Sequence, residues 1–174
     1  TRIAFIGGGN MASAIIGGLI QQGLPGSQIT VVEPLAEQRE RLEARFGLRT
    51  ATAADASLGD CGLVVWAVKP QVFKQVAAAC APHVGGALHL SVAAGIRSDS
   101  ISAWLGSERI VRTMPNTPAL VGLGMTGIYA RPAVAAADRE LIERVVGTTG
   151  QFLWMEREAD LDAVTALSGS GPAY

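Results

Sequence analysis

The sequence predicts an α/β fold of the Rossmann type, with a doubly wound, mostly parallel sheet and helices on both of its faces. Short apolar strand-like segments alternate with amphipathic helical segments along the chain. A glycine-rich turn joins the first strand to the first helix. The apolar run 63–68 is continuous, as in parallel strands that are covered on both faces. These three observations favour a parallel, doubly covered sheet.

The elements follow from local patterns. The first strand, 3–6, enters the glycine turn, after which apolar residues recur at the spacing of one helix face: Ala12, Ile15, Ile16 and Leu19. Glycine and proline at 23–26 end this helix, and Gly47 is placed to cap the second one. We expect further strands at 29–32, 48–51, 62–68, 88–92, 110–114, 126–130 and 152–155. We expect further helices at 36–46, 71–81, 98–104 and 135–146.

Composition excludes several classes of protein. Charged residues make up 17% of the 174 residues and hydrophobic ones 49%, which argues against disorder. A net charge of −1, from 14 basic and 15 acidic residues, gives no electrostatic footprint for nucleic acid. The run 63–68 is far shorter than the roughly 20 residues of a membrane span. With no leader-like segment at the start, we expect a cytoplasmic protein without a membrane partner.

Neither metal-dependent nor nucleophilic catalysis is favoured. Cys61 and Cys80 are isolated and are expected to be reduced core thiols. The two histidines have structural positions, His83 at a helix end and His89 within a strand. No group of residues has metal-ligand spacing, and no serine lies in a nucleophile elbow. Trp66, in an apolar strand, is expected in the core.

The pattern Gly7-x-Gly9-x-x-Ala12 fits the dinucleotide fingerprint. One glycine serves the tight turn, one allows the backbone to approach a pyrophosphate, and the small third residue lets helix pack on strand. The turn opens an amphipathic helix, whose amino end favours an anion. The alternative is a glycine turn without a ligand.

Glu33 ends the second strand, 24 residues after Gly9, close to the position of an acid that binds the adenosine ribose. A carboxylate there would repel a 2′-phosphate and favours NAD over NADP. Arg39 or Arg41 in the next helix could offset that charge. The alternative is a solvated glutamate at a strand end.

Further candidates follow later strands, at the edge where open α/β sheets bind ligands. In the segment 114–118, Asn116 lies between two prolines whose rigid backbone could aim it at a nicotinamide or substrate. Val68-Lys69-Pro70 and Ala93-Ala94-Gly95 end two other strands. The alternatives are a stiff turn and ordinary strand endings.

Five segments together resemble, in this order, the pyrroline-5-carboxylate reductases. They are Phe5-Ile6-Gly7-Gly8-Gly9-Asn10-Met11-Ala12, Ala67-Val68-Lys69-Pro70, Ser91-Val92-Ala93-Ala94-Gly95, Met114-Pro115-Asn116-Thr117-Pro118 and 162–174. The last of these contains Ser168-Gly169-Ser170-Gly171-Pro172-Ala173-Tyr174. The resemblance spans the whole chain, and its two proline-containing motifs near 116 and 170 are its most specific parts.

The resemblance implies reduction of 1-pyrroline-5-carboxylate to proline with NADPH or NADH. It implies a cofactor site lined by Ile6, Gly7, Gly8, Gly9, Asn10, Met11, Ala67, Val68, Lys69, Ala93, Ala94 and Gly95, with Asn116 near the nicotinamide. We add Glu33 to this site and name Asn116, Ser168 and Gly169 as substrate-adjacent candidates, with no catalytic residue assigned. Where relatives often carry a smaller polar residue, this chain has Glu33, so preference for NADP does not carry over.

The resemblance also divides the chain into a nucleotide-binding domain, 1–158, and the beginning of a helical domain, 159–174. In the family, the helical domain forms the dimer and completes the substrate pocket, so the longer protein is expected to be a homo-oligomer. Because the chain ends in a glycine-rich turn and an aromatic residue, we expect an amino-terminal fragment that binds cofactor but turns over little. Two alternatives remain, a dehydrogenase of the β-hydroxyacid type and a dinucleotide-sensing module without chemistry.

Overall fold

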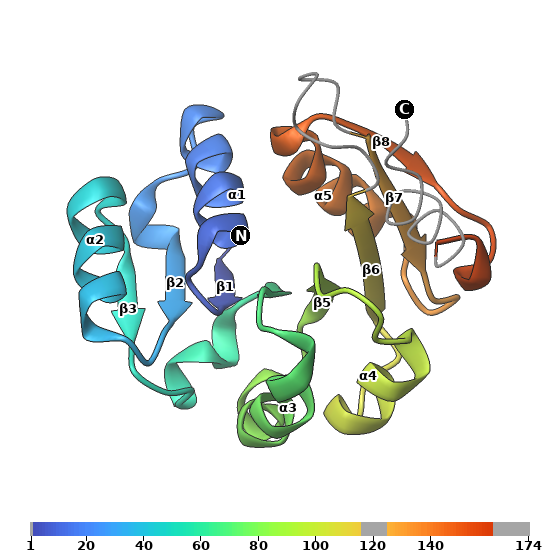
Figure 1. Ribbon diagram of the computed structural model, residues 1–174, viewed down its shortest axis with the longest axis horizontal. Helices are drawn as coiled ribbons and strands as arrows, with labels where there is room; N and C mark the ends of the chain where they lie inside the picture. The colour runs from blue at the N-terminus through green and yellow to red at the C-terminus, as the bar shows by residue number, and fades with distance from the viewer. Residues whose placement is uncertain (1, 116–124, 162–174) are drawn as a thin grey trace, which may run out of the picture.

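The computed structural model describes residues 2–115 and 125–161. The described strands are β1 (Ile3–Ile6), β2 (Ile29–Val32), β3 (Arg49–Ala51), β4 (Leu63–Trp66), β5 (Leu88–Ser91), β6 (Ile110–Pro115), β7 (Met125–Ala130) and β8 (Gln151–Trp154). The α-helices are α1 (Asn10–Gln21), α2 (Ala36–Phe46), α3 (Pro70–Val84), α4 (Ser98–Leu105) and α5 (Ala136–Val146). Figure 1 shows them arranged about one twisted sheet. The predicted Rossmann-like α/β fold is confirmed.

All eight strands belong to one sheet, in the order β3-β2-β1-β4-β5-β6-β7-β8. Neighbours from β3 through to β6 pair in parallel, with Ile6 opposite both Val32 and Trp66. The carboxyl ends of these strands therefore lie along one edge of the sheet. The chain order reverses between β1 and β4, which is where such sheets bind their ligands.

The last two strands run against the others. β7 pairs with β6 in the antiparallel direction, and β8 then pairs in parallel with β7. Only residues 116–124 separate β6 from β7, whereas a parallel crossover needs a connection of a dozen or more residues. The short connection accounts for the one reversal in a sheet that is otherwise parallel.

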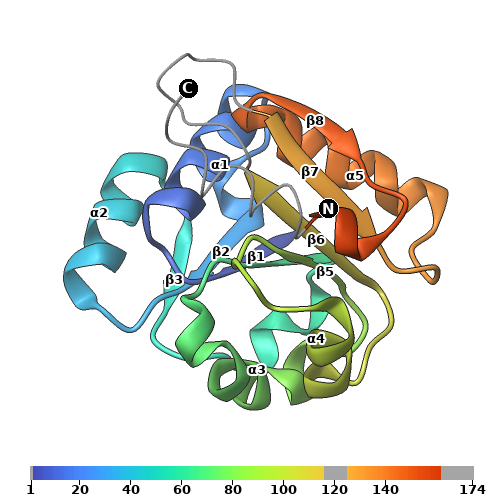
Figure 2. The ribbon, with the colours of Figure 1, turned by 45° about the vertical axis from the view of Figure 1, so that its right-hand side comes forward.

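Two apolar layers hold helices on both faces of the sheet. Phe5 and Val65 pack in the layer that includes α1, α2 and α5. Ile6 and Trp66, the next residues on the same strands, pack in the layer that includes α3 and α4. Figures 1 and 2 show the two groups of helices on opposite sides of the strands. The continuous apolar run at β4 thus reflects burial on both faces.

Most element bounds agree with the sequence patterns to within one or two residues, and α3 differs most. It begins at Pro70 and runs past Pro82 to Val84, three residues beyond the predicted end. Cys80 and Val84 are both buried against the sheet, so tertiary packing offsets the backbone hydrogen bond that Pro82 cannot make. Within residues 2–115 and 125–161, no helix is long and apolar enough to cross a membrane.

Candidate functional site

Four predicted loops meet at the carboxyl edge of the sheet. Residues 7–9 follow β1, Glu33 follows β2, residues 67–69 follow β4, and residues 93–95 lie just beyond β5. The amide of Gly7 donates to the carbonyl of Val32 at 2.9 Å, and the amide of Ala67 donates to that of Ile6 at 2.8 Å. These bonds extend the strand pairing beyond the strand ends and hold the loops side by side. The candidate site is therefore assembled from separate parts of the sequence.

The first glycine of the turn is required by its backbone. Gly7 has φ of +98°, a conformation that side-chain-bearing residues rarely adopt. A Cβ at this position would also lie 2.5 Å from the carbonyl oxygen of Ala67. Gly7 therefore allows the loops after β1 and β4 to touch.

Gly9 is different, because nothing in the described protein requires a glycine there. Its φ is −79° and a Cβ added to it would meet no atom within 4 Å. The space beside Gly9 is thus open on the side where the fingerprint places a pyrophosphate. The described fold therefore requires a glycine at position 7 but not at position 9.

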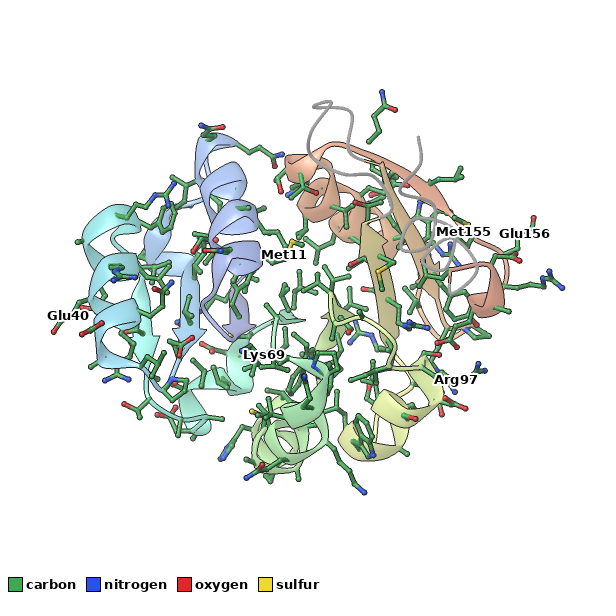
Figure 3. The ribbon with its side chains drawn as sticks, viewed as in Figure 1. Met11, Glu40, Lys69, Arg97, Met155 and Glu156 are labelled. Atoms are coloured by element: carbon green, nitrogen blue, oxygen red, sulfur yellow. The ribbon has the colours of Figure 1, made fainter. Side chains whose placement is uncertain are left out.

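The amino end of α1 is suited to an anion. No side chain caps it, and its first turn has no acidic residue. Its first amides and the helix dipole are therefore available to a phosphate. Met11, 40% exposed in this first turn, and Lys69, exposed at the start of α3, lie near the centre of the molecule in Figure 3. Lys69 follows the loop residues Ala67 and Val68, which lie against Gly7, so it brings a positive charge to the same edge of the sheet.

Glu33 is buried, with 8% exposure, and both carboxylate oxygens accept backbone hydrogen bonds. Oε1 accepts from the amide of Gly8 at 2.9 Å and Oε2 from the amide of Leu35 at 3.1 Å. The alternative, a solvated glutamate at a strand end, is not what the structure shows. The carboxylate is fixed against the glycine loop, where each oxygen keeps a further lone pair for a ribose hydroxyl.

The two arginines considered as partners of a 2′-phosphate have different environments. Arg39 donates to the carbonyl oxygens of Glu33 and Pro34, at 2.8 and 2.9 Å, and so braces the end of β2. Arg41 is exposed and lines a hollow of about 540 Å³ between α1 and α2, together with Asn10, Ser13 and Gln38. Arg41 is therefore the better placed of the two to meet an added phosphate.

The loop after β5 is held by polar contacts with its neighbours. The hydroxyl of Ser91 accepts from the amide of Ala93 at 3.2 Å, and the hydroxyl of Thr113 donates to the carbonyl of Ser91 at 3.1 Å. Gly95 has φ of +73° and turns the chain toward α4. The amide of Val92 also donates to the carbonyl of Trp66 at 3.1 Å, so Ala93, Ala94 and Gly95 leave the sheet next to the end of β4.

Three predicted residues lie outside the described ranges, namely Asn116, Ser168 and Gly169. Two residues absent from the sequence analysis join the site. The amide group of Gln38 donates to the carbonyl of Gly8, and Leu35, 65% exposed, lies directly beyond Glu33. No motif indicated them, because their proximity depends on how α2 packs against the glycine loop.

The cysteines and histidines occupy the positions that the sequence predicts, the thiols in the core, His83 at a helix end and His89 within a strand. Cys61 and Cys80 are buried and free, and burial raises the pKa of the Cys80 thiol to about 11. His89 is fully buried and accepts a hydrogen bond from the indole of Trp66 at 3.1 Å. His83 lies in the last turn of α3. No metal-binding group of three or more His, Cys, Asp or Glu residues occurs in the described part of the chain.

A family model described as "NADP oxidoreductase coenzyme F420-dependent" matches residues 2–95, more than half of the chain. The chain belongs to this family. The matched region runs from the start of the sheet to Gly95, so it contains every candidate cofactor residue of the described chain. The region that the family model matches therefore includes the residues that build the edge described above.

Relatives and solved structures extend the similarity over almost the whole chain. The chain is 47% identical, over 175 residues, to a pyrroline-5-carboxylate reductase of Pseudomonas aeruginosa, covering 99% of this chain and 64% of that protein. A pyrroline-5-carboxylate reductase structure from Coxiella burnetii matches with a TM-score of 0.90 and 35% identity, over 100% of this chain and 66% of that one. The resemblance seen in the motifs is confirmed.

A third similar protein carries a nucleotide. The pyrroline carboxylate reductase of Plasmodium falciparum, solved with NADP bound, matches with a TM-score of 0.80 and 27% identity, over 99% of this chain and 64% of that one. The chain spans less than two thirds of the length of these proteins. The relatives thus contain a further region that the 174 residues do not match.

Proposed function

We propose that the chain is the nucleotide-binding part of a pyrroline-5-carboxylate reductase, which reduces 1-pyrroline-5-carboxylate to L-proline with NADPH or NADH. The observation that carries the proposal is the 47% identity to such a reductase along a chain whose strand ends build a dinucleotide-type edge. A dinucleotide-binding fold alone hosts many activities. The identity supports one of them.

The residues of the edge fit a dinucleotide. The space beside Gly9 admits a diphosphate, and the uncapped amides of α1 offer donors to it. The carboxylate of Glu33 offers acceptors to the adenosine ribose. The edge continues past Lys69 to Ala93–Gly95. The nicotinamide half of the dinucleotide would therefore lie beside the ends of β4 and β5.

When bound, NAD(P)H supplies a hydride to the imine carbon of the substrate, while the ring nitrogen gains a proton and the C=N bond becomes a single bond. The described residues have three tasks in this reaction. The loops 7–9 and 67–69 bind and orient the dinucleotide, Lys69 offsets part of its negative charge, and loop 93–95 limits where the nicotinamide ring can lie. We assign no proton donor to the described residues.

The same proposal extends to the longer protein. The segment from 159 onward then begins a helical domain, which forms a homo-oligomer and completes the substrate pocket with Ser168 and Gly169, while Asn116 lies near the nicotinamide. A cytoplasmic setting belongs to the proposal, in keeping with two buried thiols that form no disulfide.

Cofactor binding is tested with the substitution Gly9→Ala. The added methyl group meets no protein atom, so the melting temperature should fall only by the small preference of the N-cap of α1 for glycine over alanine. The dissociation constants of NADPH and NADH should rise by about tenfold or more, because the methyl group occupies the space of the diphosphate. The matched control is Gly85→Ala at the end of α3, where φ is −60° and the space is likewise open. Equal nucleotide affinity in Gly9→Ala and in the unmodified chain would argue against this site.

Activity is tested by following NADPH and NADH oxidation with 1-pyrroline-5-carboxylate, in the 174-residue chain and in the protein of full natural length. We expect turnover in the longer protein and little in the shorter chain. A rate in the short chain equal to that of the longer protein would contradict the incomplete substrate pocket. Nucleotide binding without imine reduction by the longer protein would instead favour a sensing module, and oxidation of a β-hydroxyacid would favour the other dehydrogenase class.

A further inference from the structure

Glu158 joins three elements that are far apart in the sequence. It begins a helical turn, 158–161, just after β8. Its Oε2 accepts from Arg112 of β6 at 2.8 Å and also from the amide of Ser98, the first residue of α4. Its Oε1 accepts from the hydroxyl of Ser98 at 2.7 Å. One carboxylate therefore ties the chain that leaves the sheet to both β6 and α4.

The ion pair within this cluster lies inside the protein. The side chains of Arg112 and Glu158 are 1% and 11% exposed. Breaking such a pair on one side is costly, because the remaining charge stays buried without compensation. The guanidinium of Arg131 adds to the cluster by donating to the Ser98 hydroxyl at 3.1 Å. Within this largely buried network, Glu158 supplies the negative charge that faces Arg112, and Glu108 pairs with Arg131.

Helix α4 contributes a second reason for the charge of Glu158. The carboxylate accepts the first amide of the helix, at the positive end of its dipole. Burial alone would raise the pKa of Glu158, but the hydrogen bonds from Ser98 and Arg112 together lower it below its ordinary value. The ionised form of Glu158 is therefore the one that the surrounding groups select.

Packing reinforces the polar contacts one turn later. Leu161 is fully buried. Its Cδ1 would lie 2.9 Å from a Cβ placed on Gly127 of β7, so the glycine lets the leucine rest directly on the strand. Figure 3 places Arg97, the neighbour of Ser98, and Glu156, two residues before Glu158, on the same side of the molecule. The turn 158–161 is held at its start by charge and at its end by close packing.

Both partners of Glu158 lie close in the sequence to the candidate site. Ser98 is three residues beyond Gly95, the end of the candidate nicotinamide loop, and Arg112 is two residues before Met114 at the carboxyl end of β6. We infer that Glu158 is a positioning residue for the reduction. It fixes the turn 158–161, where the chain leaves the sheet after β8, at a defined place relative to loop 93–95 and β6. The inference rests on the proposed function for its effect on catalysis, but not for the anchoring itself.

The test compares Glu158→Gln with Glu156→Gln in the protein of full natural length. Glutamine keeps the size of Glu158 but removes the charge that faces Arg112 and turns one acceptor into a donor. We expect kcat/KM for 1-pyrroline-5-carboxylate to fall by about tenfold to a hundredfold, because small displacements of reacting groups have effects of this size. The dissociation constant of NADPH should stay within about twofold, because Glu158 contacts no part of the glycine loop. Glu158→Asp, which keeps the charge, should recover part of the loss.

Glu156 is exposed, so Glu156→Gln should leave all of these constants unchanged. An unchanged kcat/KM in Glu158→Gln would overturn the inference. A loss of NADPH affinity as large as the loss of kcat/KM would also overturn it, because it would mark a general structural defect. If Glu158→Gln does not fold, Ser98→Ala decides, because it removes the two hydrogen bonds of the Ser98 hydroxyl while Glu158 keeps its ion pair with Arg112 and Arg131 keeps its ion pair with Glu108. Ser98→Ala should then lower kcat/KM by several-fold with NADPH affinity kept, and no change in kcat/KM would overturn the inference.

A second readout does not depend on the substrate. Amide hydrogen exchange of 158–161 should be faster in Glu158→Gln than in the unmodified protein and unchanged in Glu156→Gln. If the unmodified protein fails to reduce the imine, the proposed function fails while this readout still tests the anchoring. Unchanged exchange in Glu158→Gln would overturn the anchoring itself.

Discussion

The carboxylate of Glu33, at the end of β2, accepts the amide hydrogen of Gly8 in the loop after β1, with 2.9 Å between Oε1 and the nitrogen. A Cβ on Gly8 would lie 3.4 Å from this oxygen and 2.8 Å from Cδ1 of Leu42. The middle glycine thus lets the loop fit against both residues. Glu33 both supports the glycine loop and places a negative charge beside it.

The first prediction concerns the choice of cofactor. In Glu33→Gln, the side-chain oxygen can still accept from Gly8, but the charge that repels a 2′-phosphate is lost. We expect the ratio of the NADPH to the NADH dissociation constant to fall by about tenfold, since one removed repulsion is worth about 1.4 kcal/mol. Titration of both nucleotides, followed by their fluorescence, measures the ratio.

Glu40→Gln is the control for this prediction. Glu40 lies in α2, the helix that follows Glu33, and points away from the glycine loop in Figure 3, so its substitution should leave the ratio as it is. An unmodified chain that prefers NADPH would show that Glu33 does not select against the 2′-phosphate.

The second prediction concerns two neighbouring glycines of α1. A Cβ at Gly17 would make an ordinary contact with the ring of Phe46 at 3.6 Å, whereas one at Gly18 would overlap the side chain of Thr148. Gly17→Ala should therefore raise the free energy of unfolding by about 0.5–1 kcal/mol through helix propensity. Gly18→Ala should lower it by about 1–3 kcal/mol, because the turn 147–149 must move. Urea unfolding of the two variants gives the comparison, and equal effects would contradict the close approach of α1 to Thr148.

The third prediction concerns stability against pH. Burial and, to a smaller extent, the charge of Arg109 together lower the pKa of His89 to about 4, from an ordinary value of 6.5. Between these two values the unfolded chain binds a proton that the folded one does not. The free energy of unfolding should therefore fall as the pH drops from about 6.5 toward 4, by at most about 1.4 kcal/mol per pH unit from this residue.

His89→Gln keeps an acceptor for the indole of Trp66 and should reduce the dependence on pH in that window. His83→Gln, at the end of α3, serves as the histidine control and should keep the slope of the unmodified chain. Denaturant unfolding at several pH values measures the slopes. A slope in His89→Gln equal to that of the unmodified chain would show that His89 does not account for it.

The fourth prediction concerns the packing of Leu161 on β7. In Gly127→Ala the new methyl group would lie 2.9 Å from Cδ1 of Leu161 and 3.2 Å from Cε of Met155. Both neighbours are ends of flexible side chains, so we expect a moderate loss of about 1–2 kcal/mol in the free energy of unfolding. Leu161→Ala in the Gly127→Ala background should restore little, since it exchanges the overlap for a cavity. A neutral Gly127→Ala would mean that the turn 158–161 adjusts freely.

The amino-acid sequence by itself determined the succession of strands and helices and the glycine turn at Gly7–Gly9. Apolar spacing and breaker residues are local signals, and a strand flanked by helices has few ways to bury both faces. The sequence also indicated the reductase family, through segments near 116 and 170 that lie outside the described residues. The sequence patterns did not predict the reversed direction of β7, which follows from the short connection between β6 and β7.

Only the tertiary structure decided how distant residues meet. In the folded chain Glu33 accepts the amide hydrogen of Gly8, and α3 continues past Pro82. Glu158 contacts Arg112 and Ser98, which are 46 and 60 residues away in the sequence. Such contacts depend on the packing of whole elements, and a single polar residue gives no sign in the sequence of which distant partner it will have. The charge of Glu158 anchors the turn 158–161 only because folding buries the guanidinium of Arg112 beside it.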